Sequence, residues 1–368
     1  STKGSTKGFM GKNWDGGDIA FKTDVWKECY RVLKPGGHLL AFGGTRTIHR
    51  ITCAIEDSGF EIRDQLNWLY YSGFPKSHDV SKGIDKHLGA EREILVEKGT
   101  QGIGGNGVFN GHSEDATWKI TKPATPQAAQ WEGWGTALKP AAEPACLARK
   151  PIEKGLTVAQ NVLKWGTGGL NIDKSRFAYG DPCFPLTDTL DYVHQNNSNV
   201  YGSYMIGSGQ KHNDDHHKPT KMITQSNNAG RWPANIYQCP KPSRKEKEAG
   251  LEHLTSITGA EAVGRKEGSA GVNNPRAGAG RTAEEIKNTH PTVKPLQLFK
   301  WLANLICRPG GTILDPFLGS GTTAVAGFLE GFNVIGCELT PEYWPIIKGR
   351  VSWAEKEWKN QHRQYKLF

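Results

Sequence analysis

The residues best suited to chemistry lie near the C-terminal end of the chain, in the segment 311–323, which reads GTILDPFLGSGTT. An apolar strand expected over Thr312–Leu314 leads through Asp-Pro-Phe into a glycine turn, where a ligand can approach the backbone closely. A helix expected over Thr322–Leu329 would point its free amide groups at that ligand. A second strand, Asn333–Cys337, is followed by Glu338, whose carboxylate could accept from two ribose hydroxyls. The pattern predicts a nucleoside site in a βαβ unit.

Two other interpretations of this unit remain open. Gly319, Gly321 and Ala324 match the G-x-G-x-x-G/A pattern of dinucleotide sites, which would make the chain a nicotinamide-dinucleotide enzyme. A lone match of this kind is weak, and the segment could also be a turn in an ordinary α/β sheet. Pro316 favours a loop wrapped around a ligand, because proline fixes φ and removes a donor. Only one helix is expected after Glu338, whereas a nicotinamide domain needs further strands.

A second motif precedes this unit. His290-Pro-Thr-Val-Lys-Pro295 is followed by the spacing of a helix with one apolar face, and Pro295 suits the first turn of that helix. The order of this motif, DPFLGSGTT and GFNVIGCE resembles the C-terminal half of the β-type DNA amino-methyltransferases. The resemblance implies methyl transfer from S-adenosylmethionine to an exocyclic amine of double-stranded DNA. Adenine N6 is expected more than cytosine N4, on the family's base rate alone.

The resemblance also implies how the cofactor is held. The residues it assigns to the methionine part of S-adenosylmethionine are Asp315, Phe317, Gly319 and Gly321. Thr322 and Thr323 would cap the helix beside it, and Glu338 would hold the ribose. The residues it assigns to the far side of the pocket are His290, Thr292 and Lys294.

The N-terminal part agrees with the same family. The apolar spacing predicts a helix over Val25–Leu33, which Lys-Pro-Gly-Gly ends at residue 37. A buried strand is expected over His38–Phe42, a second helix over Thr45–Ser58, and a further strand over Phe60–Tyr70. Segments 8–15, 72–77, 134–140 and 143–151 also resemble family members. The last of these would return as a strand beside residues 65–70.

One departure from the family concerns its catalytic motif, Asp/Asn/Ser-Pro-Pro-Tyr/Trp, which is expected just before residue 8 and does not occur in the sequence. Asp181-Pro-Cys-Phe184 is the nearest match, but Cys183 replaces the second proline and no apolar strand leads into it. No catalytic residue is therefore assigned within the chain.

The missing motif is expected to lie upstream of Ser1, so that the chain would be an N-terminally truncated enzyme. Such a chain should bind cofactor weakly or not at all and should not turn over. Trp14 and Asp15 lie near the expected active site as pocket candidates. A non-catalytic DNA-binding remnant is the alternative.

The chain is basic, with 46 Lys and Arg against 37 Asp and Glu and a net charge of +9. Such a balance suits a DNA partner through phosphate neutralisation, although a merely basic protein would show it too. Residues 153–285 are predicted to form an irregular target-recognition region that builds little core, and Gly99–Gly111 to form a second DNA-facing loop. The residues expected to contact DNA are Arg231, Lys241, Arg244, Lys245, Arg276 and Arg281.

The expected fold is α/β, a Rossmann-like methyltransferase sheet that is circularly permuted, mostly parallel with one antiparallel strand, and without its central catalytic strand. Residues 1–152 would form the catalytic half, with a glycine-rich insertion at about 99–130, and residues 286–368 the S-adenosylmethionine half. The seven cysteines show no paired spacing, which predicts a reducing cytoplasm without disulfides or a metal site. The family resemblance implies a bacterial or phage-encoded protein. A role in restriction–modification would fit this setting.

Overall fold

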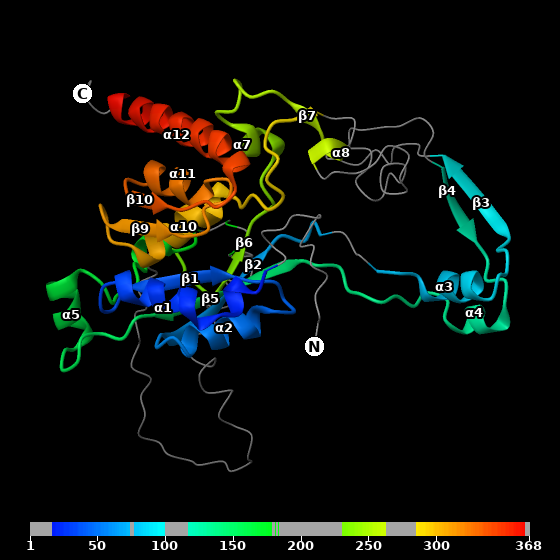
Figure 1. The fold of residues 1–368 in the computed structure, drawn as a ribbon, viewed down its shortest axis with the longest axis horizontal. Helices are drawn as coiled ribbons and strands as arrows, with labels where there is room; N and C mark the ends of the chain where they lie inside the picture. Colours follow the sequence, from blue (N-terminus) through cyan, green and yellow to red (C-terminus); the bar gives the residue numbers. More distant parts are fainter. Residues whose placement is uncertain are drawn as a thin grey trace, which may run out of the picture.

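The structure is a computed structural model that describes residues 17–73, 77–99, 117–178, 181, 183, 230–262 and 285–364. These residues form a layered body of two sheets with helices, and a smaller arm that extends to one side (Figure 1). No helix of the described part is long and apolar enough to span a bilayer.

A four-stranded sheet forms the lower layer of the body in Figure 1. Its strands, in spatial order, are β1 (His38–Phe42), β5 (Ala142–Arg149), β2 (Glu61–Leu69) and β6 (Ile236–Gln238). β5 runs antiparallel to both of its neighbours, and β6 runs parallel to β2. The predictions of one antiparallel strand and of a return strand beside residues 65–70 are therefore confirmed for this sheet.

One face of this sheet is covered by α1 (Thr23–Val32) and α2 (Ile48–Glu56). Trp26 of α1 and the fully buried Ile55 of α2 pack with Ala41 and Ala148 of the sheet. Each large apolar side chain buried in this way contributes roughly 1.5–3 kcal/mol. The Pro-Gly-Gly sequence ends α1 as predicted, and it aligns the chain for entry into β1.

The other face of the sheet is covered by α10 (Leu296–Ile306). Trp301 of α10 stacks on Phe177, and its Nε1 donates to the Ser175 carbonyl at 2.9 Å. Tyr237 of β6 packs against both rings. The predicted recognition region 153–285 thus contributes Phe177 and Tyr237 to this layer, while its residues 184–229 and 263–284 lie outside the described part.

A second, parallel sheet contains β9 (Thr312–Asp315) and β10 (Asn333–Gly336) and lies above the four-stranded sheet in Figure 1. The two strands are joined by α11 (Thr322–Leu329), which packs against α10 and against the long C-terminal α12 (Trp344–Gln364). This is the predicted βαβ unit, nearly to the residue. Among the described residues no strand pairing joins it to the four-stranded sheet, and α10 is the element that contacts both.

The arm is inserted between β2 and β5, and Figure 1 shows it projecting from the body. Its elements are α3 (Val80–His87), β3 (Ile94–Gly99), β4 (Thr117–Thr121) and α4 (Pro126–Gln130). The buried carboxylate of Asp85 joins them by accepting from Arg92 at 2.7 Å and from the Thr125 hydroxyl at 2.7 Å. Residues 117–130 of the predicted insertion contain β4 and α4, and residues 100–116 lie outside the described part.

The remaining elements are short. They are α5 (Val158–Trp165), α7 (Arg244–Glu248), β7 (Ile257–Thr258), α8 (Gly259–Ala262) and β8 (Glu285–Ile286). Of these, α7 matters for the site because the Glu246 carboxylate accepts from the Leu296 amide at 2.6 Å. Pro295 is the N-cap of α10 and has no side-chain oxygen, so a residue from the middle region supplies the missing cap.

Candidate functional site

The turn after β9 is built around two glycines in the left-handed region, Gly319 with φ 57° and Gly321 with φ 78°. A Cβ atom on Gly319 would lie 2.8 Å from the His290 Nε2 atom, so the turn needs glycine both for its conformation and for space. The close approach also shows that the two predicted segments, 290–295 and 311–323, meet at this turn. Gly321 is the N-cap of α11.

Glu338 ties the end of β10 to the glycine turn. Its Oε2 accepts from the Gly319 amide at 2.7 Å, and its Oε1 accepts from the Thr340 amide at 2.7 Å. The residue was expected to hold a ribose, whereas in this structure both oxygens already accept from the backbone. Each carboxylate oxygen has two lone pairs, so one acceptor position on each remains for hydroxyls.

Asp315 ends β9 directly below the turn. Its Oδ1 accepts from the Phe317 amide at 3.0 Å, and its Oδ2 accepts from the Thr323 hydroxyl at 2.5 Å. Burial raises the pKa of this carboxyl, and the nearby Glu338 adds to the rise, while the two hydrogen bonds lower it in part. The site thus holds a desolvated carboxylate that a cationic ligand would stabilise.

The prediction that Thr322 and Thr323 cap the helix is wrong. Gly321 occupies the N-cap, and no side chain caps the helix there. Both threonines already lie inside the first turn, so their hydroxyls serve other groups. Thr323 donates to Asp315, and the Thr322 hydroxyl accepts from Arg350 Nη1 at 3.2 Å.

His290 and Thr292 form the wall opposite the glycines. The His290 ring packs edge-on against Tyr343 with a centroid distance of 4.6 Å, and its Nδ1 lies 3.3 Å from the Thr292 amide. Because Nδ1 accepts from that amide, the tautomer with the proton on Nε2 is favoured. That nitrogen is the atom nearest to Gly319.

Lys294, predicted on the same wall, points toward the four-stranded sheet. Its Nζ lies 3.1 Å from Glu143 Oε2 at the start of β5 and 5.7 Å from the centre of the Phe42 ring at the end of β1. Lys294 therefore links the two halves of the body. The sequence analysis missed Glu143, since nothing in the local pattern marks an acid at a strand start as the partner of a distant lysine.

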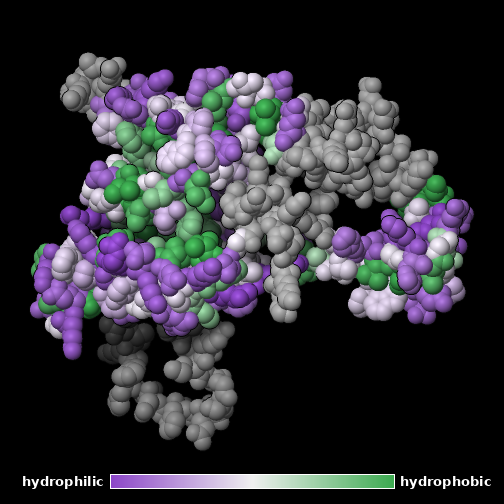
Figure 2. All heavy atoms as spheres, viewed as in Figure 1, coloured by the Kyte–Doolittle hydropathy of each residue, from purple (hydrophilic) through white to green (hydrophobic). Residues whose placement is uncertain are grey.

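Apolar side chains surround the turn on its outer side. Leu314 is 41% exposed, Phe317 50% and Leu339 89%. Figure 2 shows hydrophobic side chains at the surface of the body on this face. Exposed apolar side chains beside hydrogen-bonding groups suit a ligand with one flat apolar part, such as a purine.

The predicted DNA-binding residues that the structure describes all lie on the surface. Arg231 lies within the predicted recognition region, and Lys241 Nζ lies 4.3 Å from the centre of the Tyr70 ring just after β2. Arg244 and Lys245 are exposed on α7, where Arg244 pairs with Glu248 at 3.3 Å.

Several predictions fall on parts of the chain that the structure does not describe. Ser1, before which the catalytic motif was expected, lies outside the described residues. The same holds for the pocket candidates Trp14 and Asp15 and for the DNA-binding candidates Arg276 and Arg281. The position of the motif and the roles of these four side chains therefore stay predictions.

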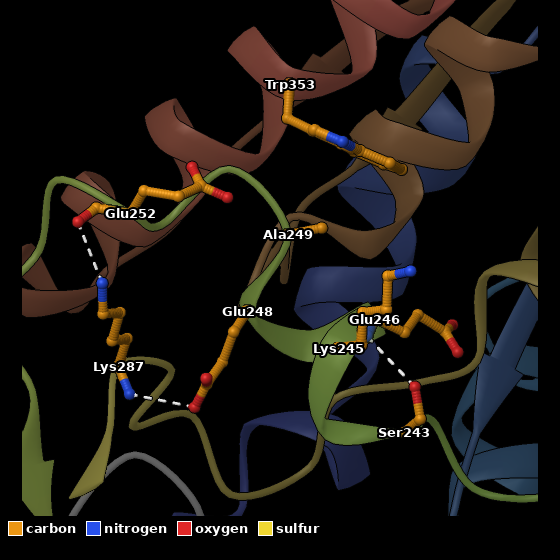
Figure 3. A pocket seen from close by; sticks show the side chains of 8 residues that line it. All are labelled: Ser243, Lys245, Glu246, Glu248, Ala249, Glu252, Lys287 and Trp353. Carbon is orange, nitrogen blue, oxygen red and sulfur yellow. Dashed lines mark hydrogen bonds between the residues drawn. The ribbon is translucent and has the colours of Figure 1, made fainter.

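A groove of about 560 Å³ lies next to α7 and α12, away from the glycine turn (Figure 3). Lys245 and Lys287 lie along it together with acidic side chains and Trp353. Its acids have structural roles: Glu248 accepts from the Lys287 amide at 3.1 Å, and Glu246 caps α10. The walls of the groove therefore carry both signs of charge.

The model of the N6/N4 family described as DNA methylase matches residues 9–349. The chain belongs to this family. The match runs through both sheets and through the glycine turn after Asp315. The resemblance noted in the sequence is thereby confirmed at the level of the family.

Several relatives share the family's sequence pattern. The Type II methyltransferase M.HindIII of Haemophilus influenzae is 22% identical over 325 residues, which are 88% of this chain and 66% of the relative. M.BglI of Bacillus subtilis is 48% identical over 62 residues, which are 17% of this chain and 18% of that protein. The chain thus spans just under two thirds of the length of M.HindIII.

Solved structures of methyltransferases align along most of the chain. The M1.HpyAVI–SAM complex is 15% identical, with 89% of this chain and 81% of that chain covered and a TM-score of 0.37. The cytosine-N4-specific PvuII DNA methyltransferase is 12% identical, with 90% and 72% covered and a TM-score of 0.38.

Proposed function

We propose that this protein is an S-adenosylmethionine-dependent DNA methyltransferase that acts on an exocyclic base amine. Family membership supports the reaction class. The desolvated carboxylate of Asp315 under a glycine turn supports the cofactor most directly, because S-adenosylmethionine carries a sulfonium and an ammonium group. A nicotinamide dinucleotide brings a pyrophosphate to such a turn instead, and an unneutralised acid there would oppose it.

The proposed cofactor site keeps the residues predicted from the sequence. Asp315 and Phe317 would line the cationic methionine part and Glu338 the ribose, while Thr323 orients Asp315. The backbone of the turn and the wall at residues 290–294 would enclose the rest. When bound, the cofactor would supply the methyl group, and the chain would hold it in line with the base amine.

We further propose one more strand, parallel to β1 and β9, between the two sheets. The Gly43 amide donates to Pro144 and the Lys150 amide to Gly37, so the backbone groups of Leu40 point away from β5. No hydrogen bond between described residues takes up these groups. In Figure 1, β9 lies on the side of its pair nearer to β1. Such a strand would complete the circularly permuted sheet and could carry acceptors for the base amine.

These proposals assign a function to each region of the chain. The regions 1–152 and 286–368 would together form the methyltransferase domain, and 153–285 would read double-stranded DNA, with adenine N6 the favoured target. The target base would have to leave the duplex to reach the cofactor. Trp14 and Asp15 stay proposed for the base pocket, and Arg276 and Arg281 for DNA.

Calorimetric titration tests the cofactor assignment. S-adenosylhomocysteine should bind residues 1–368 while a nicotinamide dinucleotide does not. The sequence alone led us to expect weak or no cofactor binding by a truncated chain. We now expect binding, because the pocket groups described above all lie between residues 290 and 343. The reverse preference would overturn the proposal.

A methyl-transfer assay on unmethylated DNA tests catalysis. We expect negligible turnover for residues 1–368, because the sequence contains no Asp/Asn/Ser-Pro-Pro-Tyr/Trp to accept from the amine. Adding a segment with this motif upstream of Ser1 should give activity. A chain that binds DNA and stays inactive with that segment would be a binding remnant.

A further inference from the structure

Arg350 is the largest fully buried side chain among the described residues, with 1% of its surface exposed. It lies on the buried face of α12 with Ile346, Ile347 and Ala354, at the spacing of a helical core stripe. A charged residue at such a position is unusual, because arginine is almost never fully buried unless it is paired.

All described hydrogen bonds of Arg350 go to the glycine turn. Its Nη1 donates to the Ser320 carbonyl at 2.7 Å, to the Ser320 hydroxyl at 3.0 Å and to the Thr322 hydroxyl at 3.2 Å. Ser320 stands between the two left-handed glycines. A single nitrogen therefore holds the backbone at the centre of the turn and the first residue of α11.

Apart from these hydrogen bonds, little in the described part of the chain compensates for burying the charge of the Arg350 guanidinium. Its Nη2 is buried without a hydrogen-bond partner among the described residues, and none of the ion pairs seen there involves Arg350. Burial lowers its pKa to about 10, and the more distant Glu246 offsets only part of this. An apolar side chain of similar volume would often stabilise such a position better. The arrangement is therefore poorly explained by stability alone.

We propose that Arg350 is a positioning residue for the cofactor turn, fixing the conformation in which residues 319–321 receive S-adenosylmethionine. The proposal rests on the proposed function. Arg350 acts through Ser320 and Thr322 and does not itself need to touch the cofactor. Without its donor, the two glycines can move to other conformations, because glycine populates both signs of φ.

The test compares R350M and R350K with R149M. Arg149 is a matched control, since it is 9% exposed but pairs with Glu61 at 2.6 Å in the four-stranded sheet. Each protein is titrated with S-adenosylhomocysteine below its own melting temperature. R350M should weaken binding about tenfold or more, since small errors of position cost this much. R350K should recover part of the affinity, and R149M should bind like the wild type.

Amide hydrogen exchange without ligand gives a second readout. The peptide covering residues 318–323 should exchange faster in R350M and keep its protection in R149M. Unchanged exchange, or equal loss of affinity in R350M and R149M, would overturn the role of Arg350. If exchange changes as expected but the wild type binds no S-adenosylhomocysteine, the turn is positioned by Arg350 and the proposed function fails instead. R350K serves the same comparison if R350M does not fold.

Discussion

Keeping the Asp315 carboxyl ionised in the folded protein lowers the free energy of unfolding. Its raised pKa means that the folded state binds a proton more readily than the unfolded state. Stability without ligand should therefore increase as the pH falls through the folded-state pKa toward the unfolded value of 3.8, and should be lost as the pH rises back through the folded-state pKa. A cationic ligand would remove this destabilisation by pairing with the ionised form.

D315N should make the ligand-free protein more stable at neutral pH and flatten this pH dependence. The amide can still accept from Phe317 and pair with Thr323, so the turn keeps its hydrogen bonds. Binding of S-adenosylhomocysteine should fall, since its ammonium group loses a charged partner. Urea unfolding between pH 4 and 7 and calorimetry measure the two effects. A variant that is both less stable and binds normally would contradict this account.

G319A should impair the site more than the same change elsewhere. At Gly319 an added methyl group meets His290 and also adopts a left-handed conformation, which costs roughly 1–2 kcal/mol. Gly310 is the control, because its φ is +68° and nothing lies within 4 Å of the added atom. Both variants should lose stability by unfolding assays, and only G319A should lose cofactor affinity. Equal affinity in the two variants would show that the His290 contact has no role.

At the scale of elements, the βαβ unit was predictable because apolar runs, glycine turn and acid follow one another within 30 residues. The helix over Thr322–Leu329 agrees with the prediction at both ends. The partners of these elements were not predictable. Glu143 and Arg350 act across long sequence separations, and only a charged residue in the apolar stripe of α12 could have signalled the second.

The arm was missed for a related reason. Its strands are short and separated by a glycine-rich segment, and the residues Gly99–Gly111 were expected to form a DNA-facing loop. The buried Asp85 carboxylate holds the arm together. Burial alone would raise the pKa of this carboxyl. Hydrogen bonds from the Ala124 amide and Thr125, together with Arg92, outweigh burial and lower the pKa. A tertiary hydrogen-bond network of this kind has no signature in sequence.

D85N should loosen the arm and leave the body intact. The amide cannot accept every hydrogen bond that the carboxylate now accepts from Arg92, Ala124 and Thr125. Hydrogen exchange should rise across 79–130 while residues 311–338 and cofactor binding stay unchanged. D79N is a suitable control, as Asp79 is an exposed helix cap in the same segment. Loss of cofactor affinity in D85N would mean that arm and body are coupled.

For the whole molecule, the net charge of +9 predicts DNA binding that weakens steeply with salt. Replacing Lys241 and Lys245 by glutamine should reduce the slope of log K against log salt by up to about 2, at about 0.9 for each phosphate contact. K359Q is the control, since Lys359 is paired with Glu355 on α12. Fluorescence anisotropy at several salt concentrations measures the slopes. Identical slopes for the double variant and K359Q would show that neither Lys241 nor Lys245 contacts DNA.

The way in which the arm joins the body also bears on how such a chain can change over evolution. The last residue of β2, Leu69, pairs directly with the first residue of β5, Ala142. A hairpin loop of a few residues could therefore connect the two strands without disturbing their register. The arm is therefore an insertion between two paired strands. Its length and sequence could change in evolution while the four-stranded sheet keeps its structure.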